Sequence, residues 1–386
     1  MASASRLRWI WQSTTWPTLR FDREPLAARL ATAQVEQGRL LGLAKAIGAT
    51  ELSFVQRDIW SGDAMATAAI EGEDLDLKAV RSSVARRLGI APAPTATIRQ
   101  DVEGLLDIME DAATHWNSAL SQERLCRWQG ALFPIGYSSL RPVATGRYRS
   151  QSDPMQIVSG PVGSETVHYE APPSDNVPRE MRSFLDWFNG TRDTYADQGI
   201  VRAAVAHVWF ESIHPFEDGN GRVGRAIVDM ALAQDARFPY RLHGISMQLQ
   251  RQRTGYYDAL SEAQHGEGDV TQWVCWFIDA FIRACQTSAR LIDESLIRAR
   301  FWSEHRAVAI NPRQRKGLDR LLEAGPGRFE GGMTPRKYVA LTGASPVTAS
   351  RDLAELVRNG LLVRVGSGRS THYDLAIDGW GWSGPR

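Results

Sequence analysis

Residues 214–225 of this chain read His-Pro-Phe-Glu-Asp-Gly-Asn-Gly-Arg-Val-Gly-Arg. The stretch joins two segments with helical patterning, one that ends at Ile213 and one that begins near Asn220. Its glycines at 219 and 221 allow backbone conformations with positive φ and the close approach of a ligand. A helix that begins here points unpaired N–H groups outward. The stretch therefore predicts a loop that binds anions such as the phosphates of a nucleotide.

The charged residues around this loop have chemistry that suits a nucleotide. Asp218 is a hard carboxylate beside the predicted phosphates, where Mg²⁺ is commonly bound. Arg222 and Arg225 fall in the first turns of a helix, where positive charge opposes the dipole, so a phosphate partner explains them better than chance. His214 precedes the loop and can accept a proton near neutral pH. A lone histidine beside a proline is more often a packing residue, but the unbroken stretch around His214 favours a catalytic role.

This stretch resembles the signature of the Fic family, in which His-Pro-Phe is followed by an acidic residue, Gly-Asn-Gly-Arg and a second arginine; the match has no departure. The resemblance implies transfer of AMP from ATP to a protein hydroxyl. His214 would deprotonate a Ser, Thr or Tyr hydroxyl, which attacks the α-phosphate and releases pyrophosphate. Asp218 would hold Mg²⁺, and Arg225 would bind the γ-phosphate. The ATP-binding residues that it implies are Glu71, Asp218, Gly219, Asn220, Gly221, Arg222, Arg225, Tyr256 and Gln264.

Position 221 bears on the choice between two reactions. In the Doc branch of the family, which phosphorylates its target, a lysine replaces the second glycine of the loop. Gly221 therefore favours adenylyl transfer over kinase activity, although it does not settle the choice alone.

The stretch from residue 146 to residue 173 breaks the helical pattern. Short strands are expected at 155–159 and 166–169, around a Gly-Pro-Val-Gly turn. This hairpin resembles the Fic flap, which pairs with an extended segment of the target by adding a strand. The residues that would dock the target are Ile157, Val158, Ser159 and Gly160. A plain surface hairpin is the alternative.

A helix expected at 250–262 resembles the adenine side of the family's nucleotide site. Tyr256 could stack on a base, and Gln264 lies two turns further on the same face. Paired tyrosines on a helix are also often half-buried packing residues, so both interpretations remain open.

Residues 67–72 read Thr-Ala-Ala-Ile-Glu-Gly and match the inhibitory pattern found before many Fic domains: Ser or Thr, three residues, Glu, then Gly or Asn. If Glu71 pairs with Arg225, the γ-phosphate loses its partner and the α-phosphate is badly aligned for attack. The resemblance thus implies an enzyme that Glu71 inhibits. In some relatives the same glutamate assists removal of AMP, and that reverse reaction stays open.

The whole chain is expected to be mainly α, with an N-terminal helical domain that carries the inhibitory motif at 1–95, a Fic-type helical core with its β-hairpin flap at 96–306, and a C-terminal winged helix at 307–386. The N-terminal part resembles a small domain of unknown function that precedes many bacterial Fic domains. Its first aromatic stretch, 7–21, is expected to be a hairpin or an extended arm. Helices are expected at 25–47, 51–60, 80–88, 178–188, 201–213, 250–262 and 270–300. Two more are expected, one from residue 97 onward and one directly after the motif at 214–225.

Residues 311–375 resemble a winged helix-turn-helix, with helices at 313–322, 334–341 and 347–359 and a wing at 361–365 and 371–375. Thr348, Ser350 and Arg351 could face a major groove, and Arg364 and Arg369 a phosphate backbone. Acidic Asp352 and Glu355 on the same helix weigh against DNA and leave a protein-interaction module open. A nucleotide-sensing DNA-binding transcriptional regulator is therefore the alternative function. A sensor needs to bind phosphate but needs no catalytic base, so the intact His214 and Asp218 distinguish the two functions.

Composition limits the remaining possibilities. The 386 residues carry a formal net charge of +1, so any contact with DNA must come from a local patch. Apolar runs are interrupted by charge, which predicts no membrane span. Three cysteines without metal-type spacing and an N-terminus without an apolar stretch favour a cytoplasmic protein. The expected partners are a protein substrate with an acceptor hydroxyl, the chain itself as a substrate, and a second copy in a homodimer that buries exposed aromatic residues.

Overall fold

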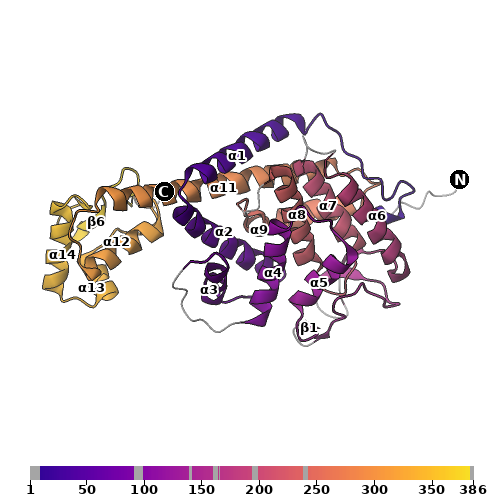
Figure 1. The fold of residues 1–386 in the computed structure, drawn as a ribbon, viewed down its shortest axis with the longest axis horizontal. Helices are drawn as coiled ribbons and strands as arrows, with labels where there is room; N and C mark the ends of the chain where they lie inside the picture. Colours follow the sequence, from indigo (N-terminus) through magenta and orange to yellow (C-terminus); the bar gives the residue numbers. More distant parts are fainter. Residues whose placement is uncertain are drawn as a thin grey trace. The chain divides into compact units, whose positions relative to one another are not determined.

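The computed structural model describes residues 9–90, 99–138, 141–159, 164, 166–193, 199–237 and 242–382. The chain divides into two compact units, Met1–Ala289 and Arg290–Arg386. Both are mainly helical, which confirms the predicted fold class (Figure 1). Gly160 of the predicted flap and the side chain of Arg369 lie outside the described parts. The three predicted domains and the two boundaries between them remain predictions.

The first unit is a bundle built around two helices, α7 and α8. Every residue of α7 is buried, so the helix runs through the middle of the bundle. Helix α8 packs along it, and the turn between them holds residues 214–219. The described helices of this unit are α1 (Ala27–Ala46), α2 (Ala49–Ile70), α3 (Leu77–Arg87), α4 (Gln100–Thr114), α5 (Gln122–Leu132), α6 (Val177–Gly190), α7 (Gly199–Ile213), α8 (Asn220–Ala236), α9 (Ile245–Arg251), α10 (Arg253–Gln264) and the part of α11 (Thr271–Glu304) up to Ala289.

Two expected helices have different limits. The helix expected at 51–60 continues as α2 through residues 67–70 of the predicted inhibitory motif, because the alanines at 64, 66, 68 and 69 favour helix and the segment buries one face. The helix expected at 250–262 is divided into α9 and α10 at Gln252, whose φ of −114° and ψ of 34° are not helical. Glu71 thus lies at the end of a long helix, as the C-cap of α2.

Helix α1 lies along α11 (Figure 1). Arg29 on α1 pairs with Asp279 on α11 at 3.1 Å, and Gln286 Nε2 donates to Glu36 Oε1 at 3.0 Å. These contacts attach the start of the chain to the last helix of the bundle.

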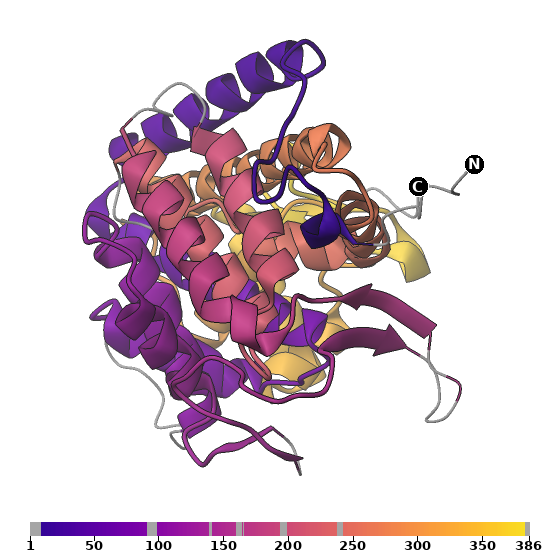
Figure 2. The same cartoon turned by 90° about the vertical axis from the view of Figure 1, so that its right-hand side faces the viewer.

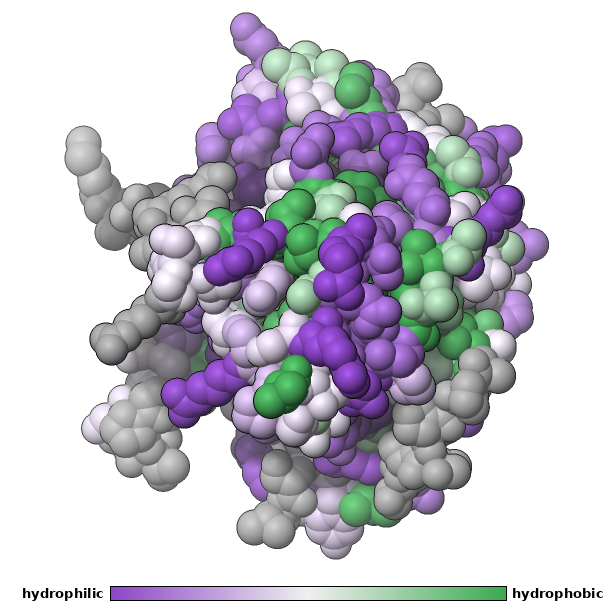
Figure 3. Space-filling model, turned by 90° about the vertical axis from the view of Figure 1, so that its left-hand side faces the viewer, coloured by the Kyte–Doolittle hydropathy of each residue, from purple (hydrophilic) through white to green (hydrophobic). Residues whose placement is uncertain are grey.

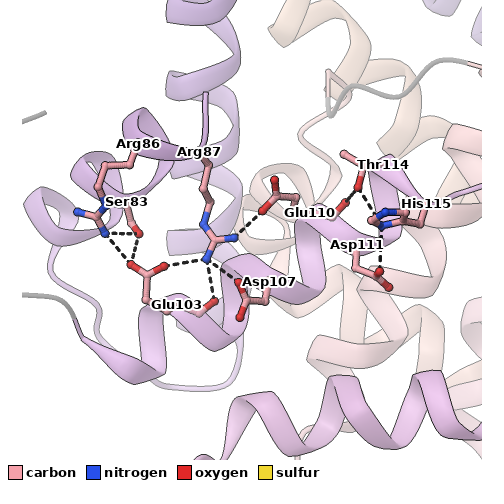
Figure 4. A network of polar contacts seen from close by, with 9 residues as sticks. All are labelled: Ser83, Arg86, Arg87, Glu103, Asp107, Glu110, Asp111, Thr114 and His115. Carbon is pink, nitrogen blue, oxygen red and sulfur yellow. Dashed lines mark hydrogen bonds and ion pairs between the residues drawn. The ribbon is translucent and has the colours of Figure 1, made fainter. Parts of the chain in front are cut away.

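Helix α3 is tied to α4 by ionic contacts (Figure 4). The guanidinium of Arg87 donates to Glu103 at 2.7 Å, Asp107 at 2.6 Å and Glu110 at 2.5 Å, and Arg86 reaches Glu103 at 2.8 Å. Because α3 follows the inhibitory motif directly, this network holds the N-terminal helices against the core.

The expected hairpin is present. Strand β3 (Gln156–Ser159) pairs antiparallel with β4 (Thr166–Glu170), and the register shifts between Ile157 and Val158. Figure 2 shows the two strands side by side at the edge of the helical bundle. A smaller pair, β1 (Tyr137–Ser138) and β2 (Arg141–Pro142), lies in the loop after α5.

The described part of the N-terminal aromatic stretch is an arm rather than a hairpin. It has a short 3₁₀ helix, η1 (Ile10–Gln12), followed by turns. Trp9 is buried and packs edge-on against Tyr169 of β4, with 5.4 Å between ring centroids. Trp11 Nε1 donates to the carbonyl of Glu170 at 2.7 Å, and Trp16 Nε1 donates to Glu180 Oε2 at 2.8 Å. The tryptophans therefore attach the arm to the base of the hairpin and to α6.

The second unit contains the elements expected at 313–375. Helices α12 (Pro312–Ala324), α13 (Pro335–Thr342) and α14 (Pro346–Arg358) are followed by antiparallel strands β5 (Leu362–Val365) and β6 (His372–Leu375). Ser345 caps α14 as expected, because its Oγ accepts from the Thr348 N–H at 3.2 Å. Buried residues from all three helices form its core, among them Leu318, Leu321, Tyr338, Leu353 and Leu356.

Within the described ranges, no helix combines the length and apolar character needed to cross a bilayer. On the face drawn in Figure 3, hydrophilic and hydrophobic residues are interspersed.

Candidate functional site

The loop between α7 and α8 has the conformation that its glycines predict. Gly219 has φ 86° and forms the N-cap of α8, whose first residue is Asn220. The Asn220 side chain folds back onto the loop: Oδ1 accepts from the Phe216 N–H at 2.9 Å and Nδ2 donates to the Phe216 carbonyl at 2.8 Å. The Asn220 side chain therefore fixes the conformation of the loop, and its backbone remains available to bind a ligand.

A buried arginine that the sequence did not single out holds His214 in place. Arg149 Nε donates to the His214 carbonyl at 2.8 Å, and its backbone N–H donates to the Pro215 carbonyl at 2.9 Å. His214 has φ 50°, an uncommon value for a residue other than glycine. The Arg149 contacts compensate for part of that backbone cost. Because Arg149 comes from an irregular segment far from the motif, no local pattern identifies it.

His214 is a neutral base in this site. Burial, assisted by the charge of Arg149, lowers the pKa of the His214 imidazole to about 4. Its Nδ1 is buried without a hydrogen-bond partner, and the nearest carboxylate oxygen is Glu211 Oε2 at 3.8 Å. At neutral pH the ring is thus unprotonated and able to accept a proton.

The inhibitory motif reaches Arg225 with two side chains. Arg225 Nη2 donates to Glu71 Oε1 at 2.6 Å, and Arg225 Nε donates to Thr67 Oγ1 at 2.6 Å. Thr67 and Glu71 are four residues apart and so lie on one face of α2. The Arg225 side chain is only 2 % exposed. Burial raises the pKa of Glu71, but the charge and hydrogen bond of Arg225 outweigh it, and the net effect is a lowered pKa.

Gly221 makes room for this carboxylate. A Cβ at position 221 would collide with Glu71 Oε1 and lie 3.0 Å from Arg225 Nη1. The Glu71 carboxylate therefore rests against the first turn of α8, where the loop geometry predicts a bound phosphate.

A second ion pair, which the sequence did not predict, holds the other arginine of the motif. Arg222 Nη1 donates to both carboxylate oxygens of Glu73, at 2.7 and 2.9 Å, and Arg222 Nη2 lies 3.4 Å from Asp218 Oδ1. The Arg222 side chain is buried, and its guanidinium also lies over the Phe133 ring. Each arginine of the motif is thus paired with a glutamate from the end of α2 or the loop after it.

A cavity of about 750 Å³ opens beside His214. Its lining combines the loop, the end of α2, the hairpin and α10. Among the predicted site residues, the cavity is lined by Glu71, Ile157, Val158, Ser159, His214, Gly221, Arg225, Tyr256 and Gln264. Asp218, Gly219, Asn220 and Arg222 are not among its lining residues and lie around the loop instead. The cavity also contacts Glu211, which sequence reasoning missed.

The two tyrosines of α10 have different partners. Tyr256 is buried, and its hydroxyl and His207 Nε2 are 2.8 Å apart. Tyr257 is 41 % exposed and donates to the Ile70 carbonyl at 3.1 Å, which Arg253 also reaches at 2.8 Å. Helix α10 therefore binds the last turn of α2. The predicted role of Tyr256 against adenine remains a prediction.

Asp218 has the chemistry for a magnesium ion. Its half-exposed carboxylate accepts from the Gly219 N–H at 2.6 Å and keeps further lone pairs free for a cation. Mg²⁺ needs few protein ligands when phosphates and water complete its shell, so one carboxylate at the loop fits. The described residues contain no group of three or more His, Cys, Asp or Glu suited to hold a metal by themselves.

Comparison with known families gives two matches along the chain. Residues 9–90 match a domain of unknown function, DUF4172, and residues 119–232 match the Fic/DOC family. The second match contains the loop and His214.

Curated relatives carry the same domain. The chain is 29 % identical over 203 residues to the protein adenylyltransferase Fic of Nematostella vectensis, a match that covers 52 % of this chain and 42 % of the relative. It is 33 % identical over 98 residues to a probable protein adenylyltransferase of Aquifex aeolicus, covering 25 % and 27 %. The chain thus spans less than half the length of these relatives.

Solved structures share the fold. A Fic family protein from Desulfovibrio desulfuricans superposes with a TM-score of 0.50 at 20 % identity, covering 90 % of this chain and 95 % of that one. A Fic-domain signalling protein from Bacteroides thetaiotaomicron gives 0.51 at 17 % identity, covering 68 % and 98 %.

Proposed function

We propose that this chain, in which residues 119–232 form a Fic/DOC-family domain, transfers AMP from ATP to a Ser, Thr or Tyr hydroxyl of a protein. The observation that supports this most directly is His214, a buried neutral base beside an anion-binding loop and a cavity of about 750 Å³. Curated relatives with this domain are named protein adenylyltransferases. The cavity also reaches the edge of the hairpin, where an extended target segment could be held.

In this reaction the acceptor oxygen attacks the α-phosphorus of ATP. The bond from that phosphorus to the bridging oxygen breaks, and pyrophosphate leaves. Because His214 Nδ1 faces Glu211, we assign Nε2 as the nitrogen that takes the hydroxyl proton. The N–H groups at the start of α8 bind phosphate oxygens, and Arg225 and Arg222 neutralise their charge. Magnesium, held by Asp218 and the phosphates, would add charge neutralisation at the leaving group.

We further propose that the resting protein is inhibited by Glu71. Its carboxylate accepts a hydrogen bond from the Arg225 guanidinium and fills the space beside Gly221. Arg225 is therefore not available to bind the γ-phosphate of ATP. The same glutamate could orient a water for removal of AMP. The chain itself and a second copy in a homodimer are the proposed additional partners.

The test is transfer of label from α-³²P-ATP to protein in the presence of Mg²⁺. We expect weak labelling of the wild type, at least about tenfold more with Glu71→Gly, and none with Glu71→Gly/His214→Ala. His115→Ala, a change at an exposed histidine, should leave labelling of the Glu71→Gly protein unchanged. Equal labelling of wild type and Glu71→Gly would refute inhibition by Glu71, and label from γ-³²P-ATP instead would indicate phosphoryl transfer.

DNA binding by the second unit is a further candidate, because one acidic residue that weighed against it is turned inward. Asp352 is buried and accepts from Arg313 at 3.0 Å and from the Tyr338 hydroxyl at 3.1 Å. Arg351 and Ser350 remain exposed on α14. A mobility shift that weakens steeply with salt, and weakens again in Arg351→Ala, would support a DNA-binding regulator. The absence of any shift at low salt would exclude it.

A further inference from the structure

We propose that Glu211 is a positioning residue for His214: its carboxylate accepts the Nδ1–H of the imidazole and balances the positive charge that His214 acquires from the acceptor hydroxyl. The proposal rests on the proposed function. It assigns a role to a residue that lies outside the twelve-residue motif.

Position and burial single out this carboxyl group. Glu211 lies in the last turn of α7, three residues before His214, which follows the helix with φ 50°. Its side chain is 6 % exposed, and Oε2 lies 3.8 Å from His214 Nδ1. A modest rotation of either side chain would bring these atoms within hydrogen-bond distance.

Two polar atoms at this point lack partners. Glu211 Oε1 and His214 Nδ1 are both buried without a hydrogen bond. An unsatisfied buried polar atom costs about 1–3 kcal/mol, so a pair of them beside a cavity indicates a functional use. The backbone also leaves space for the group, since a Cβ at Gly224 would collide with Glu211 Oε1.

The charges around Glu211 and His214 affect the pKa of Glu211, so its ionisation depends on whether Glu71 is present. Burial raises the pKa of Glu211 to about 8, Arg225 on α8 opposes this rise, and Glu71 on α2 adds to it. The charged groups facing His214 are Arg149, Glu71 and Asp218, and the backbone of Glu211 also acts on the ring as a hydrogen-bond acceptor that raises the His214 pKa. On the opposite side, Tyr256 of α10 and His207 bind each other and stay neutral. Removing Glu71 therefore favours the ionised form of Glu211, which is the form that can stabilise an imidazolium.

The chemical consequence concerns the proton-transfer step. When His214 Nε2 takes the proton of the acceptor hydroxyl, the ring becomes a buried cation. A carboxylate at Nδ1 fixes the tautomer that leaves Nε2 free and stabilises the cation as it forms. No other carboxylate oxygen within 4.0 Å of the His214 ring is found among the described residues.

The experiment uses Glu71→Gly as the active parent and follows self-labelling from α-³²P-ATP between pH 5.5 and 9.5. Glu211→Gln keeps the shape but cannot carry the negative charge. We expect kcat to fall about 10- to 100-fold with the KM for ATP within about twofold, and the dependence of kcat on pH between 6 and 8 to change. Glu211→Asp should recover part of the loss. Asp235→Asn, a change at a partly buried carboxylate that accepts from Gln37, is the matched control and should alter neither quantity.

A second measurement does not depend on activity. In the ATP-free parent at pH 9, where Glu211 is ionised, ¹⁵N NMR of the histidines should show that Glu211→Gln changes the tautomer of His214. Normal kcat and an unchanged pH profile in an active Glu71→Gly/Glu211→Gln protein would overturn the proposal. A loss that Glu211→Asp does not recover, with an unchanged His214 tautomer, would also overturn it. No labelling by the parent would instead refute the proposed function, and the NMR comparison would still test the contact.

Discussion

Glu73 also pairs with an arginine of the motif, Arg222, although no inhibitory pattern includes position 73. Nη1 of the buried Arg222 donates to both carboxylate oxygens of Glu73, at 2.7 and 2.9 Å. If Arg222 is to bind phosphate, it must exchange Glu73 for the nucleotide. The resting site would then have two glutamates that compete with ATP rather than one.

We therefore expect Glu73→Gln to tighten ATP binding. In the Glu71→Gly/His214→Ala protein, which binds without turnover, Kd for ATP should fall about two- to tenfold because Arg222 loses its competing carboxylate. Isothermal titration calorimetry measures this. Asp74→Asn changes an exposed carboxylate one residue further on and should leave Kd unchanged. A weaker Kd in Glu73→Gln would mean that Glu73 supports the site instead.

The buried Glu211 should also make stability depend on pH. Its pKa is raised by burial to about 8, above the value of about 4.5 in an unfolded chain. A raised pKa gives stability that is complete below pH 4.5 and is lost as the pH rises toward 8. Glu211→Gln removes this dependence, so its free energy of unfolding should exceed that of the parent by more at pH 8 than at pH 5. Denaturant unfolding at both pH values checks this, and a constant difference would contradict it.

At the scale of elements, the position of the end of α2, where Glu71 lies, is set by contacts of neighbouring helices with α2 and with the core. Helix α10 binds the Ile70 carbonyl through Arg253 and Tyr257. Beyond the motif, Arg87 ties α3 to three carboxylates of α4 (Figure 4). The position of Glu71 thus depends on contacts made by neighbouring helices.

Arg87→Ala should loosen this attachment. We expect the melting temperature to fall by about 2–6 °C and self-labelling of the Glu71-containing protein to rise a few-fold, since α2 leaves Arg225 more often. Adding Arg87→Ala to Glu71→Gly should not raise labelling further. Arg81→Ala, a half-exposed arginine of the same helix, is the control. An equal rise in both backgrounds would show that α3 acts by another route.

At the scale of the whole molecule, the sequence predicts the elements that have local signals. The two glycines and flanking helical patterns predict the loop at 214–225, and alternation around Gly-Pro-Val-Gly predicts the hairpin. Ser345 and the short segments after it predict α14 and the last two strands. Each of these elements is specified by residues that are neighbours along the chain, which is why a single sequence is enough to predict it.

The sequence contains no local pattern that predicts the contacts that complete the site. Arg149 and Glu73 reach the motif from 65 or more residues away, so only the folded chain brings them there. Glu211 is close in sequence, but its importance comes from burial and from the space left at Gly224. Likewise, the even apolar character of α7 hides which of its polar residues face the cavity.

Gly221 has a consequence for how this protein can change by mutation. Its missing Cβ leaves the one space that Glu71 fills at rest and that a phosphate would need during the reaction. A side chain there would take the space of the Glu71 carboxylate and of the phosphate, so under the proposed function restraint and AMP transfer would be lost together. A genetic selection for permanently active variants should therefore return changes in α2 or its supports and none at Gly221.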